Sequence, residues 1–212
     1  MPKRVVVFID YQNAYRGARA AFHNHTVDPH YFGQFHPVLL AEHLARDARE
    51  ARTLEEVRIY RGLPSSSRDS KSYGAARRQI SAWERDPRVT VVLRPIRYPD
   101  GWSGSHADGE RPQEKGIDVA LALDFAIMGH EKRYDVGLMF SADTDLKPAL
   151  EYIADKRRAW GHPTPEVAAW SSTQNHSRRL ALTGADRKVY CHWVDETTYE
   201  RVRDNTNHTL AR

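Results

Sequence analysis

Cysteine is nearly absent from this chain of 212 residues, and long apolar runs are absent altogether. The single cysteine, Cys191, excludes an intrachain disulfide and a zinc site built from several cysteines. No apolar run approaches the roughly 18 to 20 residues that a membrane-spanning helix needs. The amino-terminal stretch MPKRVVVFID also lacks the longer apolar segment and the small-residue cleavage site of a signal peptide. We therefore expect a cytoplasmic protein with no membrane partner.

A strong excess of one charge is missing as well. Lys and Arg number 32 against 28 Asp and Glu, which gives a formal net charge of +4. This mild excess is compatible with nucleic-acid binding but does not establish it, so the placement of the charges matters more than the total. A length of 212 residues suits one α/β domain with a proper core. We expect a single domain over residues 1–202 and a flexible tail over residues 203–212.

Short β-type runs alternate with longer helical patterns along the chain. The continuous apolar run at residues 5–9 is typical of a strand that is buried on both faces. Strands are expected at residues 5–9, 57–60, 90–93, 136–140, 166–170 and 189–194, and helices at 14–20, 37–48, 73–84, 118–128, 146–154 and 175–182. This alternation favours right-handed crossovers and a mostly parallel central sheet, and therefore an α/β fold.

One long connection is rich in turn residues. Residues 99–113 read PDGWSGSHADGERPQ, which combines Gly, Pro, Ser and Asp. A loop of this length in a compact domain is often functional, as a lid or a substrate rim. A disordered insertion explains the same composition, so both interpretations stay open.

Aspartates stand where two of the expected strands end. Asp10 comes directly after the first strand, Asp143 and Asp145 follow the strand at 136–140, and Asp118 opens the helix that leads into that strand. In parallel α/β sheets, ligands bind beyond the carboxyl ends of the strands. We therefore expect these four carboxylates at one edge of the sheet.

Four carboxylates packed together would repel one another strongly. A bound Mg²⁺ or Mn²⁺ removes that conflict, because these ions prefer oxygen ligands. Such an ion lowers the pKa of a bound water and stabilises the charge on a phosphate under attack. The sequence therefore favours phosphodiester hydrolysis by metal-activated water, without a covalent enzyme intermediate.

Helix capping is the alternative explanation for most of these residues. Asp143 or Asp145 could cap the helix that starts near residue 146, and Asp118 could cap its own helix, because aspartate is a favoured N-cap. Asn13 could orient a water or a phosphate, or cap the helix at 14–20. Asp10 needs an explanation of its own, since it ends a buried strand.

Asp124 is a further acidic residue, in the nearly apolar helix that Asp118 opens. It lies six residues after Asp118, which places it about 240° round the helix. It could pair with a basic side chain or support the metal site indirectly, and we favour the supporting role.

Basic residues stand where a nucleic acid would pass. Arg61 follows the second strand, Arg94 follows the third, and Lys115 and Lys147 flank the later acidic motifs. The stretch RGLPSSSRDSKSYGAARR at residues 61–78 adds a tyrosine that could stack on a base. Because Arg and Lys hold phosphates, we take these four residues as candidate substrate contacts. An ordinary solvated surface is the alternative.

Three blocks of this sequence resemble the NYN domain, a PIN-like nuclease family, and look closest to its bacterial LabA-like branch. The blocks are FIDYQN, EKGIDVALALD and SADTDLKPAL, and they occur in the family's order. The resemblance covers roughly residues 3–194. Tyr11 and Ala142 depart from it, because glycine is common at both positions in the family.

The resemblance implies a PIN-like α/β/α sandwich that binds a divalent metal and cleaves RNA. Asp10, Asp118 and Asp143 would be metal ligands, Asp145 a fourth acidic member, and Asn13 an active-site polar group. It also implies single-stranded or structured RNA as the partner, and it makes a homodimer a further expectation.

Two rival functions remain beside the metal-dependent ribonuclease. A phosphatase of the haloacid dehalogenase type would need a DxDxT motif after the first strand, and here Asp10 is followed by Tyr11 and Gln12. The other rival is a catalytically inactive PIN-like module that binds RNA or another protein. Four acidic groups facing a polyanion argue against that module unless a metal is present.

Overall fold

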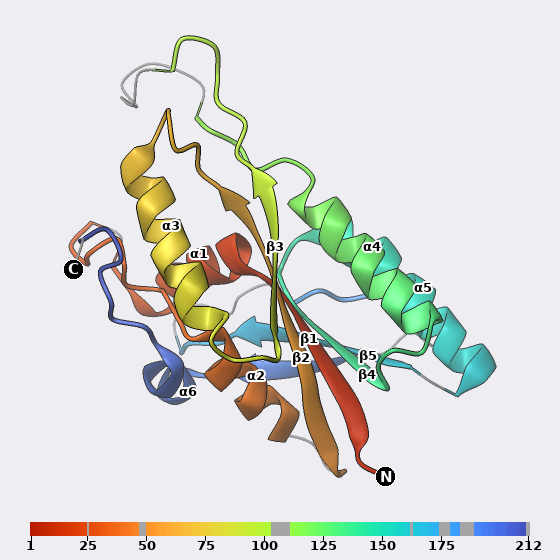
Figure 1. Ribbon diagram of the computed structural model, residues 1–212. Helices are drawn as coiled ribbons and strands as arrows, with labels where there is room; N and C mark the ends of the chain where they lie inside the picture. The colour runs from red at the N-terminus through yellow and green to blue at the C-terminus, as the bar shows by residue number, and fades with distance from the viewer. Residues whose placement is uncertain are drawn as a thin grey trace.

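The computed structural model describes residues 1–24, 26–46, 50–102, 111–161, 163–173, 179–182 and 189–210. Six strands form one sheet in the order β3-β2-β1-β4-β5-β6, and every neighbouring pair is parallel (Figure 1). The strands are β1 (Lys3–Asp10), β2 (Arg52–Leu63), β3 (Val89–Pro95), β4 (Val136–Phe140), β5 (Thr164–Trp170) and β6 (Tyr190–Val194). The predicted mostly parallel sheet is confirmed.

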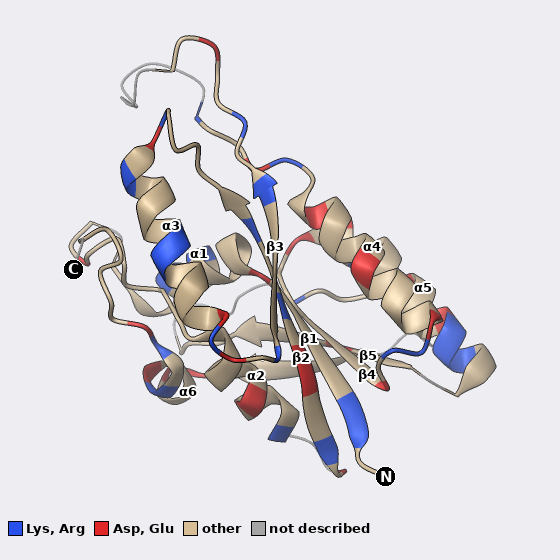
Figure 2. Ribbon diagram, viewed as in Figure 1, with Lys and Arg blue, Asp and Glu red and all other residues tan. Residues whose placement is uncertain are grey.

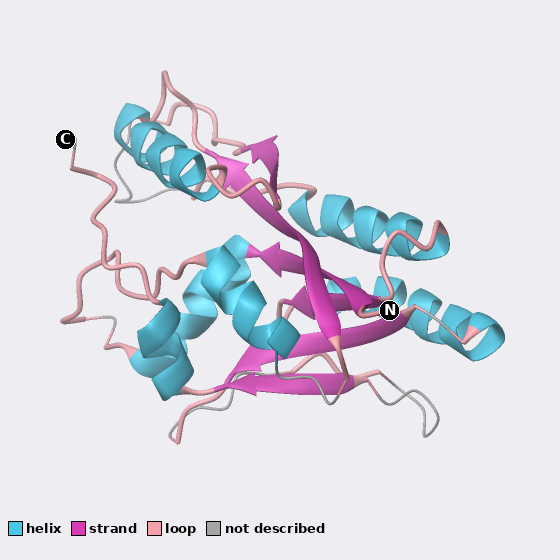
Figure 3. Ribbon diagram, turned by 60° about the horizontal axis from the view of Figure 1, so that its bottom comes forward, coloured by secondary structure: helices cyan, strands magenta, loops and turns pink. Residues whose placement is uncertain are grey.

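Helices cover both faces of this sheet. They are α1 (Tyr11–Phe22), α2 (Pro37–Arg46), α3 (Ser70–Trp83), α4 (Ile117–His130), α5 (Lys147–Trp160) and α6 (Glu196–Val202), with a short 3₁₀ turn, η1 (Thr144–Leu146), before α5. Helices α1, α2, α3 and α6 pack on one face, and α4 and α5 pack on the other (Figures 1 and 3). The fold is a three-layer α/β/α sandwich, as predicted.

The sequence of β1 explains why two cores form. Side chains alternate between the two faces of a strand. Val5, Val7 and Ile9 join the core under α1, α2, α3 and α6, while Val6 and Phe8 join the core under α4 and α5. All five are buried, so the continuous apolar run is the central strand of the sandwich.

Several elements differ in length from those expected, and the clearest departures concern three helices. Helix α1 begins at Tyr11 rather than at residue 14, because Asp10 caps it. The helix expected at 175–182 is wrong where it can be compared: residues 179–182 are not helical, and residues 175–178 lie outside the described ranges. Helix α6 was not predicted, although Asp195 caps it by accepting a hydrogen bond of 2.8 Å from the Thr198 amide.

The carboxyl-terminal segment returns to the body of the molecule. Arg203 pairs with Phe35 in an isolated antiparallel bridge, and the Asp204 amide donates to the Gln34 carbonyl oxygen at 3.0 Å. Arg78 of α3 donates two hydrogen bonds, of 2.9 and 2.6 Å, to the carbonyl oxygen of His208. The single-domain boundary and the flexible tail stay predictions. Within the described ranges, no helix is long and apolar enough to cross a membrane.

Candidate active site

The strand order reverses between β1 and β4, and this point defines the candidate site. From β1 the chain passes to β2 on one side, whereas from β4 it passes to β5 on the other. Open α/β sheets bind ligands at such a point, beyond the carboxyl ends of the strands. Asp10 ends β1, and the segment from Ser141 to Asp143 follows β4, so the predicted acidic motifs lie at this point.

Asp10 is a buried carboxylate in a fixed orientation. Its side chain accepts a hydrogen bond of 3.1 Å from the Asn13 amide and one of 3.3 Å from the Ser141 hydroxyl. Burial raises the pKa of Asp10 to about 6; the negative charges of Glu114 and Asp143 add to the rise, and the two hydrogen bonds oppose it. The fold therefore holds Asp10 where its negative charge is disfavoured.

Asn13 ties helix α1 to the loop after β4. Its side-chain oxygen accepts a hydrogen bond of 2.9 Å from the Ala142 amide, and its own amide donates to Asp10. Of the two roles considered for Asn13, the N-cap is excluded, because Asp10 occupies that position and Asn13 lies in the first turn. Asn13 is a positioning residue in this structure, since it fixes the two segments that carry Asp10 and Asp143.

Capping accounts for Asp143 but not for Asp118. Asp143 caps η1 by accepting a hydrogen bond of 3.0 Å from the Asp145 amide, and its own amide donates to the Ser141 hydroxyl at 3.1 Å. Asp145 is exposed. The cap of α4 is Gly116, which makes no side-chain hydrogen bond, so Asp118 lies inside the first turn. A carboxylate there is stabilised by the helix dipole.

The predicted gathering of four aspartates is not what the structure shows. Within the described residues, no three His, Cys, Asp or Glu side chains come close enough together to hold a metal ion. The carboxylates whose charges act on Asp10 are Glu114 and Asp143. Like charges resist closer approach, which is the physical reason for a looser arrangement than the sequence suggested.

Glu114 is the acidic residue that sequence reasoning missed. It precedes α4, is partly buried, and accepts a hydrogen bond of 3.0 Å from the Gly62 amide at the end of β2. Burial raises its pKa, while that hydrogen bond and the charges of Arg61 and Arg16 oppose the rise. A Cβ atom on Gly62 would lie 2.6 Å from the Glu114 side chain, so glycine is what permits this contact. The signal was available, because Glu114 opens the EKGID block.

Arg61 lies in a buried cluster rather than on an open surface. Its guanidinium stacks 5.2 Å from the ring centre of Tyr11 and 5.5 Å from that of Trp83, and donates to Gln79 at 2.8 Å. Burial lowers the pKa of Arg61, and the neighbouring Tyr11 and Glu114 oppose that change. Its Nε atom is buried and has no hydrogen-bond partner in the part of the chain that the structure describes.

The other basic candidates differ in exposure, and Figure 2 shows where charge collects. Arg94 near the end of β3 and Lys115 beside Glu114 are exposed, while Lys147 at the start of α5 is half-buried. In Figure 2 the carboxyl end of β3 is basic and the first turn of α4 is acidic. Asp124 lies further along α4 and accepts hydrogen bonds of 2.8 Å from Arg58 and from the Tyr60 hydroxyl. The structure therefore shows the pairing with a basic residue, and the favoured supporting role at the metal site stays a prediction.

Comparison with known proteins decides the family. A model of the NYN domain matches residues 4–161. The chain belongs to the NYN domain family. This NYN domain matches no curated protein. Its structure is similar to the crystal structure of a protein of unknown function from Vibrio parahaemolyticus, with a TM-score of 0.51 and 16% sequence identity over 92% of this chain and 94% of that chain. At this identity the likeness concerns the fold alone.

Membership of the NYN family suggests a PIN-like nuclease, and the chemistry of this site can be tested against a divalent cation. The donors are carboxylate oxygens, which are the ligands that Mg²⁺ and Mn²⁺ take. Asp10 is buried, and the charges of Glu114 and Asp143 act on it. Both of its hydrogen-bond donors, the Asn13 amide and the Ser141 hydroxyl, are neutral. Mg²⁺ keeps several waters and needs only one or two protein carboxylates. Asp10 and Asp143 therefore fit a divalent cation, although no cluster of three ligands is present among the described residues.

Proposed function

We propose that this NYN domain is a metal-dependent ribonuclease that hydrolyses RNA phosphodiester bonds at the carboxyl ends of β1 and β4. One observation carries the proposal: buried Asp10 lies within the electrostatic reach of Glu114 and Asp143 at the point where the strand order reverses. Membership of the NYN family supports the reaction class. The assignment to the LabA-like branch, the choice of RNA and the cytoplasmic location belong to the same proposal.

The residues that would hold the ion are Asp10 and Asp143, and Asp118 and Asp145 are the further candidate ligands. Glu114 adds negative charge near Asp10. When bound, Mg²⁺ or Mn²⁺ supplies a water of lowered pKa and offsets the charge that builds up on the phosphate. Asp10 is pre-oriented for this task by the Asn13 amide and the Ser141 hydroxyl.

Other parts of the site shape its charge. Asn13 fixes the loop after β4, so that Asp143 keeps its position relative to Asp10. Arg61 places positive charge beside Glu114, which limits the repulsion that a phosphate meets there. Lys115, next to Glu114 in the chain, is exposed and suited to a phosphate contact. A catalytically inactive module would not need a buried carboxylate with a raised pKa.

Cleavage of a labelled RNA with Mg²⁺ or Mn²⁺ tests the proposal. Asp10→Asn and Asp143→Asn are expected to lower the rate at least about 100-fold, because each removes an anionic oxygen from the cation site. Glu131→Gln, an exposed residue just after the far end of α4, is the matched control and should cleave like the wild type.

Two results would contradict the proposal. Wild-type protein that binds diverse RNAs without cleaving them, with either metal, would make the inactive binding module the better function. Activity that survives in both aspartate variants would mean that the carboxylates are not the metal site.

A further inference from the structure

The chain between β3 and α4 forms a basic arm, of which the structure describes residues 96–102 and 111–116. Its two sides are held together at Arg97 and Gln113, where each amide donates a hydrogen bond of 2.9 Å to the carbonyl oxygen of the other. Its described residues lie beyond the carboxyl end of β3 (Figure 1), and in this parallel sheet that is the edge at which β1 ends with Asp10. Residues 99–102 and 111–113 belong to the connection that the sequence marked as a substrate rim or an insertion, and residues 103–110 of that connection lie outside the described ranges.

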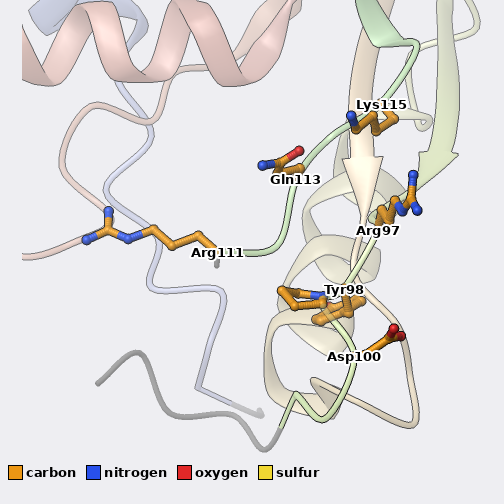
Figure 4. Close-up of a pocket in the computed structure, with 7 residues that line it drawn as sticks. Arg97, Tyr98, Asp100, Arg111, Gln113 and Lys115 are labelled. Carbon is orange, nitrogen blue, oxygen red and sulfur yellow. The ribbon is translucent and has the colours of Figure 1, made fainter. Parts of the chain in front are cut away.

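The base of the arm lines an open pocket of about 340 Å³. It is lined by Arg97, Tyr98, Pro99, Asp100, Arg111, Gln113 and Lys115 (Figure 4). Three of these side chains are cationic and one is a carboxylate. None of the three cations forms an ion pair within the described residues, so their charge is available to an anion. Lys115 and Asp100 lie at opposite ends of the set in Figure 4, so an anion is favoured at the Lys115 end.

Tyr98 is the aromatic side chain of this pocket, and neighbouring residues fix its ring. The Ser65 amide donates a hydrogen bond of 3.1 Å to the Tyr98 hydroxyl. The Arg68 guanidinium lies 5.8 Å from the ring centre and donates to the Pro99 carbonyl oxygen at 3.4 Å. The Trp102 ring lies 5.9 Å from that of Tyr98. The loop after β2 therefore holds Tyr98 in place, which lowers the entropy cost of stacking a ligand on it.

The pocket adjoins the candidate active site through consecutive residues. Gln113 and Lys115 line the pocket, and Glu114 between them is the carboxylate whose charge acts on Asp10. The same short segment therefore contributes both to the pocket and to the charge around Asp10.

We propose that this pocket binds an unpaired nucleotide of the RNA, adjacent to the bond that is cleaved. Arg97, Arg111 and Lys115 contact its phosphates, and its base stacks on Tyr98. The volume lies in the range of pockets for small ligands, which suits one nucleotide and not a duplex. A base offers its face to an aromatic side chain only when it is unpaired. The assignment to RNA rests on the proposed function.

The first test measures the Kd of the full-length protein for a short single-stranded RNA by fluorescence anisotropy, in EDTA so that no cleavage occurs. Tyr98→Leu should raise the Kd about 5-fold or more, because it removes the stacking surface. Tyr98→Phe keeps the ring and should bind within about 2-fold of the wild type. A Kd unchanged by Tyr98→Leu, or raised equally by Tyr98→Phe, would overturn the stacking role.

The second test concerns the phosphates and uses exposed residues whose replacement leaves the core untouched. Arg97→Ala/Arg111→Ala should reduce the slope of log K against log salt by about 1.4, as expected for two lost contacts to a single strand. Arg157→Ala/Arg158→Ala, at the end of α5, is the matched control and should keep the wild-type slope. Equal slopes for both double variants would overturn the proposal.

The two proposals fail in different ways. Wild-type protein that binds single-stranded RNA through Tyr98 but cleaves none refutes the nuclease and supports the pocket. If the wild-type protein cleaves RNA, and the Tyr98 and arginine variants bind RNA as tightly as the wild type, the pocket proposal alone is refuted. Tighter binding of duplex RNA, or of single-stranded DNA of the same sequence, refutes the assignment to unpaired RNA.

Discussion

The two ends of the sheet treat buried charge in opposite ways. Near the amino end, Glu166 of β5 accepts two hydrogen bonds from Arg52, of 2.9 and 2.7 Å, and lies 2.7 Å from a ring nitrogen of His192. At the carboxyl end, Asp10 has two neutral donors and two acidic neighbours. The negative charge of Glu166 is balanced by Arg52 within the protein, whereas the surroundings of Asp10 keep an excess of negative charge.

The pKa values express this difference. Burial alone would raise the pKa of Glu166, but the hydrogen bonds from His192 and Arg52 outweigh it and lower the pKa to about 2. Burial raises the pKa of Asp10 to about 6, and its acidic neighbours add to the rise. A buried carboxylate with partners stabilises the fold, whereas one without them marks a place where a ligand completes the charge balance.

The largest expected effect is a loss of stability when Glu166 is removed from its cluster with Arg52 and His192. Glu166→Gln leaves Arg52 and His192 buried without their carboxylate and should lower the free energy of unfolding by about 3 to 5 kcal/mol. Urea denaturation measures this change. Glu50→Gln is the control, because exposed Glu50 bonds to the same Arg52 at 3.2 Å, and should cost no more than about 1 kcal/mol. Similar losses in both variants would contradict the distinction between the two ends.

A smaller effect is expected from the pH dependence of stability at the other end, measured without divalent metal. The pKa of Asp10 is higher in the folded state, at about 6, than the ordinary value of 3.8 for an aspartate. The folded state therefore binds the proton more tightly, and this group's contribution to stability falls as the pH rises from about 4 to 6. Asp10→Asn should remove that fall and gain about 1 to 3 kcal/mol above pH 6 relative to the wild type. An Asp10→Asn protein less stable than the wild type at pH 7 would contradict the prediction.

The smallest effect concerns the coupling between two carboxylates. Glu114→Gln removes a negative charge that raises the pKa of Asp10, so the Asp10 titration should move to lower pH. Carboxyl NMR of the metal-free protein would follow the titration, and a shift below about 1 pH unit is expected, since burial is the larger cause. Glu131→Gln should leave the Asp10 titration unchanged. If the pKa of Asp10 is the same in Glu114→Gln as in the wild type, the coupling between the two carboxylates is excluded.

The acidic motifs at the strand ends followed from the sequence, because local patterns determine them. The apolar run before Asp10 requires a buried strand, and a parallel sheet brings its end beside the segment that carries Asp143. The α/β/α layers followed from the alternation of strands and helices.

What the sequence could not supply depends on contacts between distant segments. Glu114 is buried against Gly62, which lies 52 positions away, and no local pattern reports that contact. Arg61 follows a strand as an exposed residue would, yet Tyr11 and Trp83 from two different helices enclose it. Helix α6 has only 7 residues, too few for a clear helical periodicity.

Because Gly62 has no side chain, it leaves room for Glu114, and this contact couples the evolution of positions 62 and 114. Any larger residue there must displace Glu114, so positions 62 and 114 cannot vary independently without altering the charge around Asp10. Across related proteins, glycine at the end of β2 should therefore accompany glutamate before α4, and loss of one should accompany loss of the other. That covariation would allow Glu114 to be recognised as part of the site from an alignment of related sequences.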